Sequence, residues 1–271
     1  MLFKKRKCEY CRSEYDPALH NCPTCNRFNQ DFVRNKVSRN VFYFHPIIQI
    51  ALFIIGFRFG GMLASQYIFA FLMYELPRND FTNVQFELLV YTSMLAGLLI
   101  AIFLTRRKLF FSRFKRPMDY LYGIGYAITV LAAGTFISAL LSFIHPVGNN
   151  ANQEGIVNLT TAYPFLMFII VCLIGPVCEE LTYRVGLYSF LRRINKYLAF
   201  AVTVIVFALI HFDFAAQGDD LINELWALPT YLVSGFVLTL AYEHRGPACS
   251  IIAHALYNSI AFVLTLVATH G

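Results

Sequence analysis

The sequence predicts an all-α protein: a polytopic transmembrane helical bundle of about seven spans with a small zinc ribbon at the N-terminus. Hydrophobic residues make up 58% of the 271 residues and charged residues only 14%, whereas soluble domains carry roughly 25% charged residues. Long apolar stretches begin near Phe42 and recur to the end of the chain. Two closely spaced cysteine pairs precede the first stretch, in the place where a signal peptide would have its apolar core.

Residues 1–40 form the predicted head. They contain two CxxC pairs, and this spacing lets a tight turn in each pair direct two thiolates at one ion. A bound ion replaces the hydrophobic core that so short a segment lacks. The alternative is two reactive or incidental thiol pairs. We expect one structural zinc ion, held by Cys8, Cys11, Cys22 and Cys25.

The two CxxC pairs also indicate the compartment and role of the head. Clustered cysteine pairs differ from the dispersed cysteines of a secreted disulfide scaffold, so we expect a reducing compartment. A four-cysteine site has no open coordination position for a substrate. The head is therefore expected to be structural, or to dock a cytoplasmic partner, and not to catalyse a reaction.

Residues 41–271 form the predicted membrane domain. A helix rises about 1.5 Å per residue, so roughly 20 residues cross about 30 Å of hydrocarbon. Arg58 interrupts the first apolar stretch, and it either faces a polar cavity or separates two half-segments. The predicted spans are residues 45–74, 84–105, 119–144, 162–190, 197–212, 225–243 and 247–268.

Basic residues alternate along these spans. They fill 1–39, 106–116 and 192–196 and recur at Arg245. The alternate loops, 75–83, 145–161 and 213–224, carry only one basic residue, Arg78. By the positive-inside rule, this pattern predicts a cytoplasmic N-terminus and an outside C-terminus. The basic clusters suit an anionic lipid surface, and nothing in the pattern indicates nucleic-acid binding. We expect an integral, multi-pass protein of a bacterial plasma membrane, because the chain is compact.

Ionisable side chains recur at a similar depth in three late spans. Counted along the helical rise from the basic ends, Glu180, His211 and His254 lie roughly 18, 22 and 14 Å deep. Glu180 and Arg184 share one helical face, whereas Glu179 is turned about 100° away and has no such partner. Each feature alone also fits helix packing or a buried salt bridge. Because ionisable groups are costly in a membrane, their convergence predicts a functional site.

Three short motifs occur in order on these spans: EExxxR from Glu179, FxxxH from Phe207 and HxxxN from His254. Together they resemble the CPBP family of intramembrane proteases (CAAX proteases and bacteriocin-processing enzymes), which includes the Ras-converting enzyme. The resemblance covers about residues 119–268, the predicted protease-like core, and leaves out the head. It implies hydrolysis of a peptide bond within the membrane.

The resemblance also implies roles for individual residues. Glu179 would activate water together with His211, while His254 and Asn258 would hold the developing oxyanion. The ion pair one turn further along the fourth span would shape the site. Hydrolysis needs a base for water and donors for the developing negative charge, and these residue types supply both. The implied catalytic residues are Glu179, Glu180, Arg184, His211, His254 and Asn258.

The residues leave the role of an active-site metal open. A desolvated carboxylate gains basicity and suits a metal-free mechanism. Two histidines and a glutamate equally suit a zinc ion that keeps one open position. Both mechanisms fit the sequence.

The sequence thus predicts an intramembrane endopeptidase, surrounded by membrane lipid, that acts on a membrane-associated protein or peptide of undefined identity. One alternative is a non-proteolytic membrane scaffold, or a bacteriocin-immunity or regulatory protein. Another is a small transporter that uses the polar layer as a solute site. The unpaired Glu179 argues against a scaffold, and the lack of an inverted repeat argues against a transporter.

Overall fold

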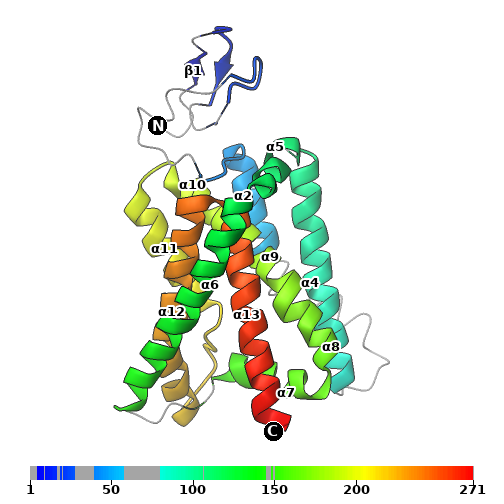
Figure 1. The fold of residues 1–271 in the computed structure, drawn as a ribbon, viewed down its shortest axis with the longest axis vertical. Coiled ribbons are helices and arrows are strands. Elements are labelled where there is room, and N and C mark those ends of the chain that lie inside the picture. The colour runs from blue at the N-terminus through cyan, green and yellow to red at the C-terminus, as the bar shows by residue number, and fades with distance from the viewer. Residues whose placement is uncertain are drawn as a thin grey trace.

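A bundle of helices makes up most of the molecule, and a small head lies at one end of it (Figure 1). The last helix of the chain finishes at the opposite end of the bundle (Figure 1). The predicted fold class, a helical membrane bundle with a small cysteine-bearing head, is confirmed. The computed structural model describes residues 5–8, 10–16, 19, 21–27, 40–57, 80–105, 107–144, 148 and 150–270.

Five helices of the described chain are long and apolar enough to cross a membrane. One of them is a composite of residues 164–192. All five correspond to predicted spans, although the helix for the predicted span 225–243 begins earlier, at Asp219. The other four are α4 (Asp80–Phe103), α6 (Pro117–Ser142), α12 (Asp219–Arg245) and α13 (Pro247–His270).

The first and fifth predicted spans correspond to shorter helices. Helix α2 (Pro46–Ile54) continues as an apolar helix to Phe57. Arg58 and the rest of the predicted 45–74 span lie outside the described residues. Helix α11 (Lys196–Leu209) has 14 residues, or about 21 Å of helical rise, which is less than the thickness of the hydrocarbon layer.

A helix occupies the connection that the sequence predicts as a loop at residues 145–161. This helix, α7 (Ala151–Ala162), begins after Asn150, whose side chain accepts a hydrogen bond from Gln153 N and so caps the first turn. Asn150 Nδ2 also donates to Glu224 Oε2 in α12 over 3.1 Å. The predicted loop therefore contains a helix. The sequence pattern did not reveal it, because one contact that fixes its start is made by Glu224, which is distant in the sequence.

The composite fourth span changes helix type along its length. The sequence predicts an α-helix that opens near Pro176. Proline lacks a backbone N–H and cannot continue the α-helical hydrogen-bond ladder, and the structure has π-helices on both sides of it. In order, the elements are α8 (Pro164–Met167), the π-helix η3 (Phe168–Ile174), α9 (Gly175–Glu179), the π-helix η4 (Glu180–Tyr188) and α10 (Ser189–Arg192).

Helix α2 crosses η4 at close range. A Cβ atom added at Gly186 would lie 2.9 Å from Phe53 N and 3.1 Å from Gln49 O, so only glycine fits without a shift of the backbone. Leu52 and Leu181, one from each element, are buried in the same hydrophobic core. On its other side, η4 contacts α13 and α12. The π-helical segment is therefore held between several helices.

The head is a two-stranded hairpin that contacts the bundle. Strand β1 (Arg6–Lys7) pairs antiparallel with β2 (Glu14–Tyr15). Arg193, which directly follows α10, places its Nη1 2.7 Å from Asp16 Oδ2 in the head. The same guanidinium donates to Gln49 Oε1 of α2 over 2.9 Å. One arginine thus joins the head, α2 and the end of the composite span.

Candidate active site and zinc site

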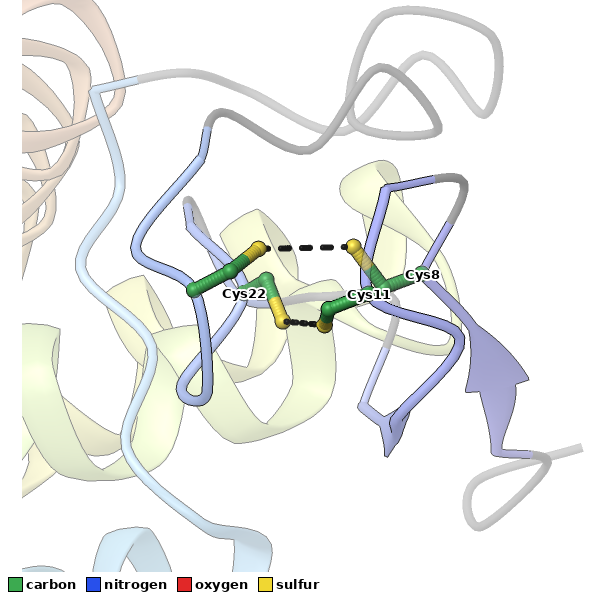
Figure 2. Close-up of side chains that lie close together, drawn as sticks. Cys8, Cys11 and Cys22 are labelled. Atoms are coloured by element: carbon green, nitrogen blue, oxygen red, sulfur yellow. Dashed lines mark hydrogen bonds between the residues drawn. The ribbon is translucent and has the colours of Figure 1, made fainter.

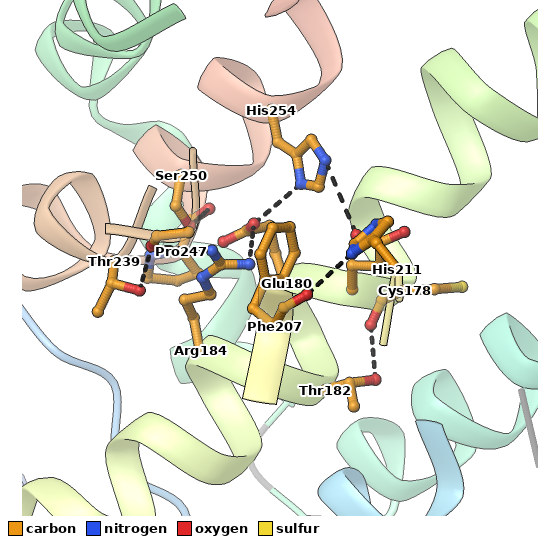
Figure 3. A network of polar contacts seen from close by, with 12 residues as sticks. Cys178, Glu180, Thr182, Arg184, Phe207, His211, Thr239, Pro247, Ser250 and His254 are labelled. Atoms are coloured by element: carbon orange, nitrogen blue, oxygen red, sulfur yellow. Dashed lines mark hydrogen bonds and ion pairs between the residues drawn. The ribbon is translucent and has the colours of Figure 1, made fainter. Parts of the chain in front are cut away.

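Glu180 is a fully buried carboxylate at the start of η4 with two partners. Arg184 Nη1 donates a hydrogen bond to Glu180 Oε1 over 2.9 Å, and His254 Nδ1 lies 3.0 Å from the same oxygen (Figure 3). The side chains of Glu180 and Arg184 are both 0% exposed. Glu180 therefore links η4 to α13.

Arg184 is held by three elements of the bundle. Besides Glu180, it contacts α12, where its Nη2 donates to the Gly235 carbonyl oxygen over 3.2 Å. Its guanidinium also lies over the ring of Phe207 in α11, 4.2 Å from the centroid, which is a cation–π contact. The side chains that the sequence expects to share a helical face do meet, although the segment between them is a π-helix.

Glu179, the last residue of α9, has a different environment from its neighbour. Its side chain is 16% exposed. Its Oε2 atom is buried and accepts no hydrogen bond from the described residues. His254 Nε2 lies 3.8 Å from this oxygen, which is beyond hydrogen-bond distance. Glu179 thus keeps one carboxylate oxygen free to accept a proton.

His254 lies between the two neighbouring glutamates. Its Nδ1 faces Glu180 and its Nε2 faces Glu179. A carboxylate only accepts hydrogen bonds, so the contact with Glu180 requires a hydrogen on Nδ1. Nε2 then accepts a hydrogen bond in the neutral ring and donates one in the imidazolium. The second nitrogen is directed to the side on which Glu179 lies.

His211 follows the end of α11. Its Nδ1 lies 2.8 Å from the Phe207 carbonyl oxygen, and because a carbonyl only accepts, Nδ1 carries the hydrogen. Nε2 is then an acceptor, and the described residues give it no hydrogen bond. The imidazole stacks on the ring of Tyr231 in α12, with centroids 4.6 Å apart and planes inclined by 15°. This arrangement fixes the ring plane of His211.

Asn258 lies one helical turn after His254 in α13. Its Nδ2 donates to the Val171 carbonyl oxygen of η3 over 2.9 Å. The amide nitrogen carries two hydrogens, so one donor remains for another acceptor. Asn258 therefore connects α13 to the π-helical part of the fourth span.

Four of the predicted residues line a single cavity of about 360 Å³ inside the bundle. They are Glu179, His211, His254 and Asn258. The cavity wall also includes residues of α4, α7 and α12. The structure brings these four side chains to one cavity. Glu180 and Arg184 are not among the residues that line it. Glu180 contacts His254, and Arg184 contacts Glu180 and Phe207.

Tyr231 and Gly235 contribute to this site, and the sequence did not single them out. Tyr231 orients the His211 ring, and Gly235 supplies a backbone acceptor to Arg184. A tyrosine or glycine in an apolar span is too common to indicate a function. Their contacts depend on where α12 packs, which no local pattern specifies.

The head cysteines converge on one point. Cys8 Sγ lies 3.7 Å from Cys25 Sγ, Cys11 Sγ lies 3.5 Å from Cys22 Sγ, and all four sulfurs lie within 4.8 Å of one another. Figure 2 shows three of these side chains pointing towards one another between two turns of the chain. A tetrahedral site with Zn–S bonds of about 2.3 Å separates its sulfurs by about 3.8 Å. The spacing fits one zinc ion.

The two CxxC turns have matching backbones. Arg12 N donates to Cys8 O, and Asn26 N donates to Cys22 O, each over 2.9 Å. Arg12 and Asn26 have φ of 57° and 56°, the left-handed conformation that follows each pair. A hydrogen bond with the Ser13 hydroxyl, over 3.3 Å, lowers the pKa of Cys22 to about 5. A thiolate, the form that binds metal, is thus available at neutral pH.

The two candidate sites differ as ligand sets. In the part of the chain that the structure describes, the four cysteines are the group of His, Cys, Asp and Glu side chains whose ligand atoms converge on one point. Glu179, His211 and His254 share a cavity but do not converge in this way. Their arrangement is that of a carboxylate and two histidines around a cavity of about 360 Å³.

The fold and site define an integral, multi-pass membrane protein with a carboxylate–histidine cavity inside its bundle. Residues 161–260 match the family model of the Rce1-like proteins, described as type II CAAX prenyl endopeptidase Rce1-like. This segment contains all seven residues that the three motifs specify, among them the six implied catalytic residues. The resemblance to the CPBP family is therefore confirmed.

Several bacterial proteins are similar to the chain. The UPF0177 protein YvdC of Lactococcus lactis is 28% identical over 145 residues, which cover 53% of this chain and 52% of that protein. The UPF0177 protein YbdI of the same species is 23% identical over 193 residues, 70% of this chain and 97% of that protein. The "Putative membrane peptidase YdiL" of Bacillus subtilis is 26% identical over 155 residues, 53% of this chain and 58% of that protein.

The extent of these matches is partial. The chain spans about half the length of the first curated relatives it matches, with 52% and 46% of their sequences covered. No solved structure matches the chain.

Proposed function

We propose that the chain is an intramembrane endopeptidase that hydrolyses a peptide bond of a membrane-associated protein or peptide. The observation that carries this proposal is the free carboxylate oxygen of Glu179 in a cavity that it shares with His211 and His254. A buried carboxylate oxygen without a hydrogen bond is costly inside a membrane protein, so its presence in the cavity points to chemistry. The Rce1-like match over residues 161–260 supports the same class of reaction.

The proposed mechanism begins with a water molecule between Glu179 and His211. Glu179 takes a proton from the water, whose oxygen bonds to the carbonyl carbon of the scissile peptide. His211 orients the water through its free Nε2. When the C–N bond breaks, the proton passes from Glu179 to the leaving amine. The products are a new carboxyl terminus and a new amino terminus.

The carbonyl oxygen becomes negatively charged during this attack and needs donors. His254 Nε2, in the imidazolium, and the remaining hydrogen of Asn258 Nδ2 supply them. Glu180 supports the imidazolium by accepting from His254 Nδ1, and Arg184 holds Glu180 in position through its hydrogen bond to Oε1. Glu180 and Arg184 are therefore positioning residues in this proposal, and this scheme proceeds without a metal ion.

We also propose that the head holds one structural zinc ion through its four cysteines. The near-tetrahedral sulfur spacing and the two matching turns support this assignment. The head would stay on the cytoplasmic side. Helix α5 (Arg107–Ser112) and α10, which border two basic segments, lie at the head's end of the bundle (Figure 1). Together with the positive-inside rule, this placement supports a cytoplasmic N-terminus.

A comparison of membrane peptides from cells with the active chain and cells with Glu179→Gln tests the endopeptidase proposal. We expect peptides or new termini that appear only with the wild-type chain. A matched control is Glu154→Gln, which removes an exposed carboxylate from α7 outside the cavity and should leave the products unchanged. Identical peptide profiles for wild type and Glu179→Gln would contradict the proposal and favour a non-proteolytic scaffold.

A further inference from the structure

Glu87 is a second carboxylate on the wall of the same cavity, and the mechanism above does not use it. It lies in α4, a helix that carries none of the motif residues. Tyr91, one turn further along α4, lines the cavity too. The Tyr91 carbonyl oxygen accepts from Cys178 Sγ over 3.6 Å, and Cys178 directly precedes Glu179. The face of α4 that bears Glu87 is thus packed beside the element that bears Glu179.

Glu87 has no hydrogen bond or ion pair with any residue in the described part of the chain. Val84, Leu88 and Tyr91, which flank Glu87 in α4, belong to one hydrophobic cluster. The cluster also contains Ile156, Leu159, Met167 and Phe262. A carboxylate in such surroundings weakens folding unless a partner compensates it. In the described part of the chain no side chain compensates this acid, which leaves a ligand in the cavity as its candidate partner.

The charge of the cavity wall indicates what that ligand is. The described lining residues include two carboxylates, Glu87 and Glu179, and two histidines, but neither lysine nor arginine. With His254 as the imidazolium of the proposed mechanism, the two carboxylates still leave the wall with one net negative charge. Surrounded by protein and lipid, such a cavity attracts a cation more strongly than the same groups would in water. The apolar wall accommodates hydrophobic side chains at the same time. The cavity therefore suits an apolar peptide segment that carries one positive charge.

We propose that Glu87 is a specificity-determining residue that receives a lysine or arginine side chain of the substrate, a few residues from the scissile bond. This inference rests on the proposed function, since it takes the cavity to be the one that holds the substrate. The apolar stem of the basic side chain would lie along the wall formed by α7 and α13. Its charged end would pair with the Glu87 carboxylate, while Glu179 stays free for water.

Binding to an inactive chain tests this assignment without requiring cleavage. The full-length chain carries Glu179→Gln and is reconstituted in lipid nanodiscs. The probes are synthetic peptides with one apolar membrane segment, in which a single lysine is moved one position at a time, and a matching set with glutamine. At one position or two neighbouring ones, we expect the lysine peptide to bind roughly tenfold more tightly than its glutamine counterpart, as for a partly desolvated charge pair.

Further variants in the same background attribute this preference to one carboxylate. Glu87→Gln should abolish the preference, Glu87→Asp should retain most of it, and Glu87→Lys should reverse it towards peptides that carry glutamate. Glu154→Gln should leave it unchanged, because Glu154 is exposed and outside the cavity. Unchanged binding of the glutamine peptides by Glu87→Gln would show that its loss of preference does not reflect misfolding.

The outcomes separate this inference from the proposed function. A lysine preference that depends on Glu87, in a protein whose wild-type form cleaves no peptide, would support the binding site and contradict the endopeptidase. Cleavage by the wild type with no lysine preference would do the reverse. Equal binding of both peptide sets, a preference that survives Glu87→Gln, or no binding of any peptide would each overturn the assignment of Glu87.

Discussion

His254 Nδ1 lies 3.0 Å from Glu180 Oε1, so a histidine of α13 is anchored on a carboxylate that is completely buried. This contact gives two adjacent glutamates different roles. In each glutamate, Oε2 has no hydrogen bond from the described residues. Glu180 is fully buried with its Oε1 bound to Arg184 and His254, whereas Glu179 lines the cavity. Because their roles differ, substitutions of Glu179 and of Glu180 should have different effects.

Glu180→Gln is expected to reduce stability first and activity second. The substitution leaves Arg184 without its charged partner in a fully buried position, which costs about 3–5 kcal/mol in comparable buried pairs. Thermal unfolding in detergent should show a clear fall in Tm and a low folded yield. Glu154→Gln is the exposed control and should unfold like the wild type. An unchanged Tm for Glu180→Gln would show that the ion pair does not hold the site together.

Asn258→Ala is expected to lower the rate of cleavage by two to three orders of magnitude, as roughly follows from losing one oxyanion donor. The substitution also removes the hydrogen bond from Asn258 to the Val171 carbonyl oxygen. If Asn258 had only this structural role, Asn258→Ala would lower the Tm and not kcat. Measuring kcat and Tm on the same samples separates the two. A large loss of Tm with an unchanged kcat per folded molecule would contradict the oxyanion role.

Replacing Cys22 and Cys25 with serine should release one zinc ion per chain. Closed thiolate sites bind zinc with roughly sub-micromolar affinity or better, and they supply the folding free energy of small domains. Elemental analysis of the purified protein should fall from about one zinc ion per chain to none, while the bundle stays helical by circular dichroism. Cys172→Ala removes a cysteine buried in η3 and should keep the metal. Unchanged zinc in the double variant would exclude the proposed ribbon site.

Gly186→Ala should destabilise the crossing of α2 and η4. The added Cβ would meet the backbone of α2 at 2.9 Å, and backbone atoms yield little, so we expect a loss of about 1–3 kcal/mol. Gly125→Ala in α6 is the matched control, since nothing lies within 4 Å of the added carbon there. Equal unfolding midpoints for the two variants would show that the helices separate freely.

Much of the architecture follows from apolar length and charge placement. The spans at α6 and α13 could be predicted because each is a long apolar run bounded by polar residues. Helix α7 could not be predicted in this way. One of the contacts that fix its first turn joins Asn150 to Glu224, which lies in a helix distant in the sequence. The π-helical turns around Pro176 also depend on packing, because the proline explains a break in the ladder but not the geometry that follows it.

Part of the candidate site could also be predicted from the sequence. Glu179 and His254 stand out because ionisable residues are rare in membrane spans. Their convergence in one cavity needed the packing of α9, α11 and α13. The sequence alone did not single out Tyr231 or Glu87. A tyrosine fits any span, and an acid about five turns before the basic connection, near the start of its span, resembles a helix end.

The rate of peptide cleavage per folded molecule by the purified Glu179→Gln protein tests the central claim most directly. The substitution keeps the shape of the side chain and removes the base. The account predicts a protein with near-normal yield and Tm and no detectable cleavage of a membrane-tethered peptide that the wild type cleaves, with His211→Ala behaving in the same way. Glu179→Gln that cleaves at the wild-type rate, beside a well-folded and inactive Glu180→Gln, would contradict it and exchange the roles of the two glutamates.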